Sequence, residues 1–546
     1  MRGSVNFLQG FTTILGILLT RTRSQYAALI IFSGMVLGDF LFRTYLFPYY
    51  IVLLENLGAY PNWEMLDVSF APIVWLSFFA IVLGSLTIVI TFAAQNIPKL
   101  IDLYMDHWVS LLFVWWAVAC LAHALTVKVL SEIGVKVIAS LVFNFHILLA
   151  VSFVIGFPFI FSILRSTKTS NVINNLLNGS YSSINRLASK GSNAKISLNE
   201  VAKIQYDLFE GLNQLIDLLV YVPFKDPKAH VIEGIGALLR HYVKLKPDIP
   251  DSFFKVDESI QDDISFRTMK SRMEDVEKTC TFYEQKSFRL IGNVYNIFLD
   301  TGDFDLSTLC AEQLSQIGKI AISSDDTELV KVIAVRFNTH FRFALKHGQH
   351  NNEPRNLYNL IFYYGRFIIY LIDKKQKDMI KTCVGYLVFY AQACFNAVPH
   401  AKSLAFILDV LAFEMQKLMH KFYEENWDRK FQEEMLQQFL VFDNFQDVDK
   451  IFTVKFFSQN HGVRLLQIGL ALYYLDKKED EFARLIAKDT IQDIDLMGQD
   501  LFSKTMDSIY KKLKFYGPKF WEDTDRGNLN IYFTYFKDEI DSFKKM

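Results

Sequence analysis

The chain has 546 residues, enough for two or three domains, and hydrophobic residues make up 51% of it. Its formal net charge is −1 at pH 7, so charge gives no general attraction to nucleic acid, and we expect no nucleic-acid partner. The five cysteines form no CxxC pair, which argues against a disulfide framework or a zinc site and favours reduced, mostly buried thiols.

Residues 1–25 combine a broken apolar run with positive charge. The run from Asn6 to Thr20 is interrupted by polar residues, and Arg21 and Arg23 follow it. A cleavable signal peptide carries its charge before the apolar run. We therefore predict an amphipathic, interfacial helix at the inner membrane surface.

Four long apolar stretches follow within residues 26–164. Each meets the roughly 20 residues that a helix needs to cross the hydrocarbon core. The predicted spans are Tyr26–Phe47, Phe70–Ala94, Trp108–Leu130 and Val137–Leu164, and Pro48 lies at the far end of the first. Because a backbone in lipid must satisfy its own hydrogen bonds, this region is predicted to be a four-helix transmembrane bundle.

The charges that flank the spans predict their orientation. Nine Lys and Arg residues lie on one side of the bundle and two on the other. Positive charge is enriched on the cytoplasmic side, so both termini are predicted to be cytoplasmic. We expect a multi-pass protein of a cell inner (plasma) membrane, bacterial as a working assumption. An interfacial aromatic belt is predicted from Trp63, Trp75, Trp108 and Tyr49.

Five polar residues inside the apolar stretches are candidates for a functional site: Asp39, Arg43, His123, Asn144 and His146. Asp39 and Arg43 are four residues apart, which places them on one face of a helix. Charged groups at membrane depth are costly and often mark an ion or proton path. The alternative is a self-neutralising pair whose Arg43 reaches the headgroups, with histidines that only hydrogen-bond inside the bundle.

Small residues in the first two spans predict close helix packing. Gly34 and Gly38 form a GxxxG pattern, and Gly84 lies in the middle of the second span. The first span is therefore expected to face another helix, in this chain or in a second copy. The alternative is a lipid-facing pair of glycines. Gly156 and Pro158 are expected to kink the fourth span.

The remaining chain reads as a linker and a large soluble part. Residues 165–199 are basic and rich in Ser and Asn, and we predict a helical extension followed by a loop near Ser189–Ser197. The basic side chains are expected to approach lipid headgroups. Residues 200–546 repeat a helical apolar period, which predicts a cytosolic all-helical, repeat-like domain without strands. Two loosely similar segments, each a helix, an acidic turn and a helix, lie about 100 residues apart. This spacing does not support a 34-residue repeat.

We find no motif that indicates catalysis or a bound cofactor, so we predict neither an enzyme nor a metal site. His340 and His347 are seven residues apart, too far for two ligands of one metal on a helix, and we interpret them as solvent-facing. The polar and aromatic segment Lys519–Asn530 is interpreted as a docked surface loop, since its oxygens alternate too irregularly for a calcium loop.

Two functional hypotheses remain. The first is a non-enzymatic membrane protein whose cytosolic helices act as a scaffold, sensor or assembly module for a protein partner or a homo-oligomer. The second is an oligomeric ion channel whose cytosolic domain forms a regulatory ring. Asp39, Arg43, His146 and the glycine face motivate the second hypothesis.

Overall fold

The computed structural model describes residues 22–59, 67–96, 108–166, 168–192, 196–263, 266–443, 450–524 and 527–546. Within these ranges the chain is helical apart from one two-stranded β-hairpin, which confirms the predicted helical class. The chain divides into two compact units: residues 1–175 with 220–223, and residues 176–219 with 224–546. We call them the membrane unit and the helical unit.

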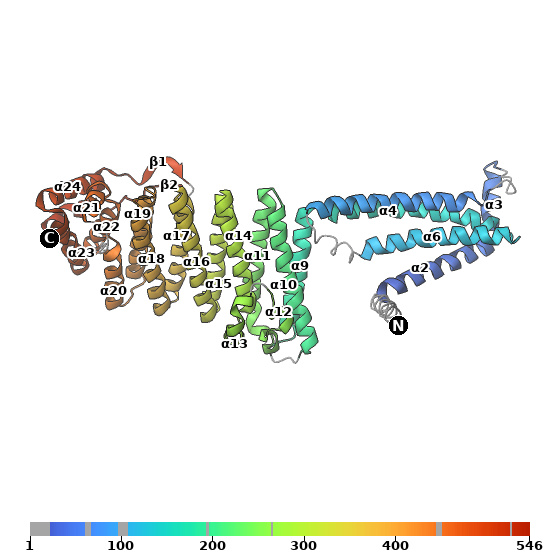
Figure 1. The fold of residues 1–546 in the computed structure, drawn as a ribbon, viewed down its shortest axis with the longest axis horizontal. Coiled ribbons are helices and arrows are strands. Elements are labelled where there is room, and N and C mark those ends of the chain that lie inside the picture. The colour runs from blue at the N-terminus through green and yellow to red at the C-terminus, as the bar shows by residue number, and fades with distance from the viewer. Residues whose placement is uncertain are drawn as a thin grey trace, which may run out of the picture. The chain divides into compact units, whose positions relative to one another are not determined.

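The membrane unit consists of long apolar helices. Figure 1 shows α2, α4 and α6 as extended rods, and α6 packs against α2, α4 and α8. The elements are α2 (Thr22–Leu41), the π-helix η1 (Phe42–Leu46), α3 (Phe47–Asn56), α4 (Phe70–Asn96), α6 (Trp108–Glu132), α7 (Ile138–Val142), the π-helix η3 (Phe143–Leu149) and α8 (Ala150–Ser166).

Three helical runs among the described residues are long and apolar enough to cross a membrane: Ala28–Asn56, Leu112–Glu132 and Ile138–Gly156. The sequence predicted four. The region of the second predicted span is α4, whose apolar run over fully described residues, Phe70–Gly84, is shorter than a membrane crossing. The structure therefore supports three of the four predicted spans, and residues 1–21 of the predicted interfacial segment lie outside the described ranges.

The first span extends further than predicted. We expected it to end near Phe47, but the helical run continues through Pro48 to Asn56. Proline removes a backbone donor and clashes with a preceding carbonyl in a regular α-helix. Here Pro48 falls in the first turn of α3, directly after the wider π-helical turn η1, where the missing donor is tolerated.

The core of the membrane unit is built from small residues on α6 and large ones around them. Ala119, Cys120 and Ala124 are buried there, beside Trp75 of α4 and Phe143 of η3. Small side chains let neighbouring helices approach closely.

The three glycines predicted to pack helices differ in their surroundings. A Cβ atom at Gly38 would lie 3.3 Å from the ring of Phe143, so this glycine lets α2 approach η3 in the same chain. Gly34 and Gly84 are exposed, and no atom lies within 4 Å of a Cβ built on either. Pro158 lies inside α8.

The helical unit is made of consecutive antiparallel helices. Its elements are α9 (Thr169–Ala188, shared with the membrane unit), α10 (Leu198–Tyr221), α11 (Lys225–Leu245), η4 (Lys246–Asp248), η5 (Asp251–Phe254), α12 (Glu258–Gln261), η6 (Arg267–Arg272), α13 (Met273–Lys278), α14 (Phe282–Thr301), α15 (Phe304–Ser323), α16 (Thr327–Asn351), α17 (Arg355–Asp373), α18 (Lys377–Ala397), α19 (Leu404–Glu424), α20 (Arg429–Leu440), η7 (Val441–Asp443), α21 (Lys450–Gln459), α22 (Gly462–Asp476), α23 (Asp480–Met497), α24 (Gln499–Phe515), η8 (Lys537–Glu539) and α25 (Ile540–Lys545).

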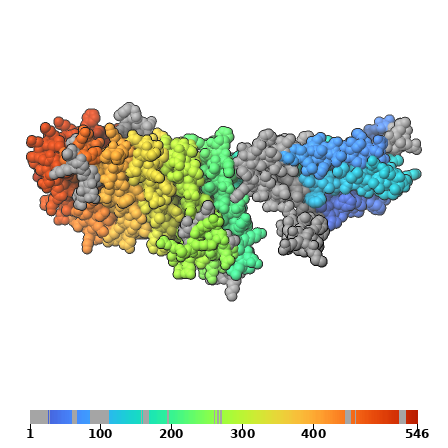
Figure 2. Space-filling model, viewed as in Figure 1, coloured from blue at the N-terminus to red at the C-terminus, as the bar shows by residue number. Residues whose placement is uncertain are grey.

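These helices stack in two layers, because each packs against its neighbour and against the helix after that. One layer runs α11, α15, α17, α19 and α22, and the other runs α14, α16, α18 and α20. The colour bands of Figure 2 follow one another through this unit in sequence order. Tight turns join successive helices, with left-handed residues such as Asp325, Asn352 and Lys375 just after helix ends.

In both layers, hydrogen bonds between helices of the same layer join residues about fifty positions apart in the sequence. Ser307 bonds Asn356, 49 residues on, at 2.7 Å, and Gln416 bonds the carbonyl of Leu466, 50 residues on, at 3.0 Å. Tyr390 bonds the carbonyl of Asn338, 52 residues before it, at 2.9 Å. Two successive helices with their turns account for this separation.

The linker prediction is only partly matched. The helical extension exists as α9, which starts after α8 ends at Ser166. Its basic residues do not all project freely: Lys190 lies 2.7 Å and Arg186 3.7 Å from the carboxylate of Glu200.

The segment after α24 forms the β-hairpin, which the sequence reading missed. Strand β1 (Lys519–Thr524) pairs antiparallel with β2 (Gly527–Leu529). The strands are too short to show an alternating pattern. Asn530, just after β2, is buried and donates to the carbonyl of Gly517 at 3.1 Å, so the segment is tied down at its base.

Candidate functional site

Three of the five predicted polar candidates meet inside the membrane unit. Oδ2 of Asp39, on α2, accepts a hydrogen bond from Oγ of Ser140, on α7, at 2.9 Å. The same oxygen lies 3.6 Å from Nε2 of His123, on α6. Nδ1 of His123 lies 3.0 Å from Nδ2 of Asn144, on η3. Asp39, His123 and Asn144 therefore form one connected chain across three helical segments.

The chain ends at Trp75, on α4, which the sequence reading had placed in the interfacial aromatic belt. Trp75 is instead fully buried, and its Nε1 donates to Oδ1 of Asn144 at 2.5 Å. Placing Trp75 at the interface was therefore wrong. We missed Trp75 and Ser140 because neither residue type is unusual in an apolar helix, and no local spacing links them to Asp39.

Arg43 and His146 are not part of this chain. Arg43 is exposed and forms no ion pair with Asp39 or with any other described residue. Arg43 lies in the π-helix η1, which begins at Phe42, just after α2. His146 is exposed, and its Nδ1 lies 2.6 Å from the hydroxyl of Tyr50 on α3.

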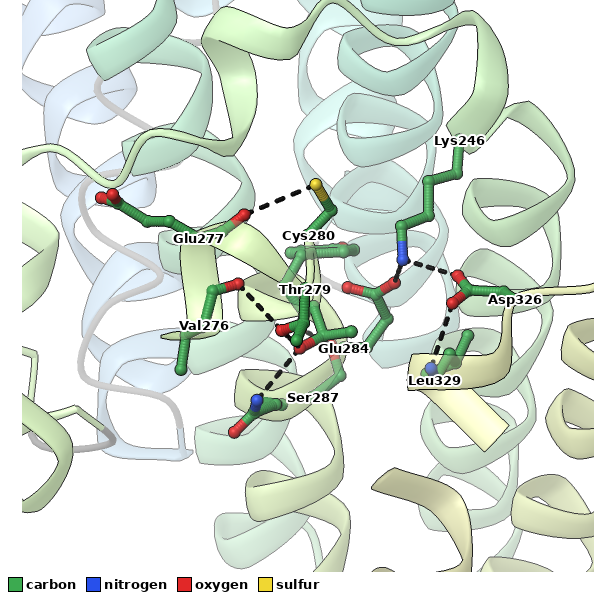
Figure 3. Close-up of polar contacts among 12 residues, drawn as sticks. Lys246, Val276, Glu277, Thr279, Cys280, Glu284, Ser287, Asp326 and Leu329 are labelled. Carbon is green, nitrogen blue, oxygen red and sulfur yellow. Dashed lines mark hydrogen bonds and ion pairs between the residues drawn. The ribbon is translucent and has the colours of Figure 1, made fainter. Parts of the chain in front are cut away.

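A second polar cluster lies in the helical unit, where Lys246 joins three helix ends (Figure 3). Its Nζ lies 2.7 Å from Oε1 of Glu284, in the first turn of α14, and 2.7 Å from Oδ2 of Asp326. Asp326 also caps α16, because its Oδ1 accepts from the backbone N–H of Leu329 at 3.0 Å. The cluster therefore ties the end of α11 to the starts of α14 and α16.

Burial and the ion pairs act in opposite directions on the pKa values of this cluster. The Glu284 side chain is fully buried, and burial raises the pKa of its carboxyl even though Lys246 opposes the rise. For Lys246, burial alone would lower the pKa, but the two carboxylates outweigh it and the pKa is raised. We interpret the cluster as a structural clamp, since its two ion pairs join the ends of three helices.

His340 is buried rather than solvent-facing, which corrects the sequence interpretation. Its ring stacks on Tyr295 with centroids 4.3 Å apart, between α16 and α14. Burial lowers the pKa of His340 to about 3, so it stays neutral at physiological pH. His347 is half-buried. No group of three His, Cys, Asp or Glu among the described residues is arranged to hold a metal ion.

The burial of the cysteines agrees with the expectation that most thiols are buried. All five are free, and Cys120, Cys310, Cys383 and Cys394 are buried, while Cys280 is partly buried. For Cys383 and Cys394, in the helical unit, burial raises the pKa to about 12. These two thiols are therefore protonated and unreactive at neutral pH.

The most distinctive surface feature of the helical unit is a groove of about 580 Å³ across α15, α17 and α19. Aromatic side chains of Tyr358, Phe362 and Phe413 line it. The Lys417 ammonium lies 5.5 Å and 5.4 Å from the ring centroids of Phe362 and Phe413 and 2.6 Å from the Glu414 carboxylate. The groove thus combines aromatic side chains with the Lys417–Glu414 ion pair and with polar groups that include the carboxylate of Asp305.

The C-terminal segment forms one wall of this groove through Leu529 and Ile531. It is held by a bond from the Tyr532 hydroxyl to Oδ2 of Asp409, on α19, at 2.7 Å. Burial raises the pKa of Asp409 to about 7, although the bond from Tyr532 opposes the rise. No proximity signal in the sequence connects these two residues, which are 123 positions apart.

Comparisons of this chain with protein-family models, with curated proteins and with solved structures found no match. The functional argument therefore depends on the groove across α15, α17 and α19 and on the polar chain from Asp39 to Trp75.

Proposed function

We propose that this protein is an integral membrane scaffold whose helical unit binds a cytosolic protein. In this proposal four helices cross an inner membrane with both termini in the cytoplasm, and α4 crosses it together with the three runs that are long and apolar enough. The groove across α15, α17 and α19 is the observation that carries it. A concave surface built from successive helix pairs is how stacked helical proteins commonly bind partners.

The membrane part of the proposal is supported by the outward-facing side chains of the first span. Large apolar residues on α2 are exposed in the isolated chain, among them Leu29, Ile30, Leu37 and Phe40. A soluble protein rarely exposes such a continuous apolar surface. Lipid, or the same helix of a second copy in a homo-oligomer, would cover it.

The similar sequence separation of several hydrogen bonds between helices supports a scaffold role for the helical unit. Hydrogen bonds recur between residues 49 to 52 positions apart, as Ser307–Asn356 and Tyr390–Asn338 illustrate. We propose a repeat of about fifty residues, in which each helix pair stacks on the next. Stacked helical arrays expose long surfaces and enclose no central cavity. This architecture favours the binding of a partner over catalysis.

The groove also indicates what kind of segment it would bind. Its aromatic side chains share the cavity with two aliphatic side chains of the chain's own C-terminal segment, Leu529 and Ile531. We propose a partner segment with aliphatic side chains, inserted against Phe362 and Phe413. Aromatic anchors of this kind usually dominate the free energy of binding.

Site-specific photo-crosslinking in the cells of origin tests this proposal. With Phe413 replaced by p-benzoylphenylalanine, we expect one discrete crosslinked protein. Adding Phe362→Asp should remove at least nine-tenths of that product, because a buried unpaired charge opposes an aliphatic ligand. Phe389, exposed on α18 in the other layer, is the control position and should give no such product. Equal products from both positions, or none from Phe413, would contradict the proposal.

Ion conduction is a second candidate function, favoured by the polar chain from Asp39 to Trp75. Polar residues linked across a transmembrane bundle often line proton or ion paths. Reconstituted in liposomes, a conducting protein would show ion flux that falls at least tenfold in Asp39→Asn. Absence of flux over a wide range of voltage and pH, with the protein inserted and folded, would exclude this function.

A further inference from the structure

The helical unit has a second pocket, of about 660 Å³, at two of its turns. Glu424, at the end of α19, and Trp427, in the turn before α20, line it. Lys477 and Glu479, between α22 and α23, contribute as well, and Phe536 comes from the C-terminal segment. No described residue lines both this pocket and the groove across α15, α17 and α19, so the two sites are separate.

The aromatic rings of the pocket already hold one cation. The ammonium of Lys477 lies 5.7 Å from the ring centroid of Tyr473 and 5.9 Å from that of Phe536. These two rings meet edge to face, with centroids 5.4 Å apart, and Trp427 lines the same pocket. A ring face attracts a cation within about 6 Å of its centroid. The aromatic lining therefore favours a positively charged group.

The charges at the pocket leave one carboxylate available to a ligand. Glu424 is exposed and forms no ion pair within the described part of the chain. Glu479 lies 3.7 Å from Nη1 of Arg429, and Lys477 lies 3.0 Å from the carboxylate of Asp476. Because these two residues have partners of opposite charge, Glu424 is the group that an incoming cation would pair with.

The amide of Gln432 supplies a buried acceptor at the same pocket. Gln432, on α20, is 6% exposed and lines the pocket. Its Nε2 donates to the carbonyl oxygen of Trp427 at 2.6 Å, and a carbonyl can only accept, so this contact fixes which end of the amide is nitrogen. Oε1 is then left without a hydrogen-bond partner among the described residues. A ligand that brings an N–H group would satisfy it.

Trp427 has the opposite requirement. Its indole Nε1 is buried and donates to no described residue, and an indole nitrogen can only donate. A free guanidinium offers donors alone, whereas an arginine within a peptide also carries backbone carbonyl oxygens. The unmet acceptor of Gln432 and the unmet donor of Trp427 together favour an arginine in a peptide over a small cation.

We propose that this pocket binds the arginine side chain of a peptide segment from a partner protein. The guanidinium takes the ring faces of Tyr473 and Phe536 and donates to Gln432 and Glu424. Arginine fits better than lysine, because its planar group can stack on a ring and donate at its edge at the same time. Lys477 covers the same rings in the unbound chain and leaves them when arginine binds. The proposal does not depend on the groove or on ion conduction.

Ligand-detected saturation-transfer NMR of the full chain in detergent tests the proposal. N-acetyl-arginine N-methylamide should bind saturably, and its citrulline counterpart, which has nearly the same shape and no charge, at least about fivefold more weakly. Glu424→Gln should weaken arginine binding at least about threefold. Glu425→Gln is the matched control, because Glu425 lies outside the pocket and pairs with Lys421 at 2.7 Å. Lys477→Met should tighten binding at least about threefold, since the competing ammonium is gone.

Several results would overturn the proposal. One is the absence of saturable binding, and another is equal binding of the citrulline compound. A third is an equal loss in Glu424→Gln and Glu425→Gln, which would indicate a general charge effect. Methylguanidinium that binds as tightly as the capped arginine would overturn the assignment to a peptide. Gln432→Leu should also weaken binding, and if it fails to fold, the variants at the exposed residues Glu424 and Lys477 decide. Crosslinking at Phe413 tests a different site, so the two proposals can fail separately.

Discussion

Lys246→Met should lower the free energy of unfolding of the helical unit by about 3–5 kcal/mol, as removal of one partner from a buried ion pair typically does. The loss has two parts. Glu284, whose side chain is fully buried, loses the ammonium that lies 2.7 Å from its Oε1, and its Oε2 has no hydrogen-bond partner among the described residues. In addition, Asp326 loses its link to the end of α11.

Pulse proteolysis of the full chain in detergent, over a urea series, measures this loss. Lys244→Met is a matched control, because Lys244 is exposed two residues earlier in the same chain segment. Its effect should stay within about 0.5 kcal/mol. The double variant Lys246→Met with Glu284→Leu should recover much of the stability, since no buried charge remains without a partner at position 284. A Lys246→Met variant as stable as the control would refute the clamp.

Asp409→Asn should make the helical unit more stable above pH 7, by at most about 4 kcal/mol, and change little near pH 4. This limit is the free energy that corresponds to a pKa raised from 3.8 to about 7. A raised pKa means that the folded chain binds a proton that the unfolded chain has already released. Stability is therefore lost as pH rises from about 4 to about 7, and Asn, which never ionises, avoids that loss.

The difference between variant and parent protein, not the parent profile alone, checks this prediction. Burial lowers the pKa of His340 to about 3 and of His420 to about 4. These two histidines therefore make the folded protein less stable as pH falls below the pKa of a histidine in the unfolded chain. Their effect has the opposite sign and cancels in the difference. Asp500→Asn, at an exposed carboxylate, is the control. A difference that does not grow between pH 4 and pH 7 would contradict the burial of Asp409 against the C-terminal segment.

The sequence was informative where one element carries its own signal. Apolar runs and helical periods predicted the helices, and a polar residue inside an apolar run marked Asp39, His123 and Asn144 as candidates. These are local properties of single helices. The same reasoning identified no partner for any of them, because hydrogen bonds between helices depend on packing that no single helix encodes.

The errors have physical causes of the same kind. Arg43 was expected beside Asp39 because four residues make about one helical turn, but the two side chains form no ion pair in the described structure. Trp75 was assigned to the interface from its residue type, although its indole serves a buried amide. Lys246 was not noticed at all, because Glu284 and Asp326 lie 38 and 80 residues away along the chain. His340 looked solvent-facing because Tyr295, its stacking partner, comes from another helix.

The central claim is that a membrane bundle holds the helical unit on the cytoplasmic side. Leu198, at the start of α10, is 76% exposed and can be replaced by cysteine as a reporter. With Leu198→Cys in sealed spheroplasts whose membranes resist alkaline carbonate extraction, a membrane-impermeant maleimide should label the chain only after the membrane is permeabilised. Labelling of intact spheroplasts, or release of the chain by carbonate, would contradict the account.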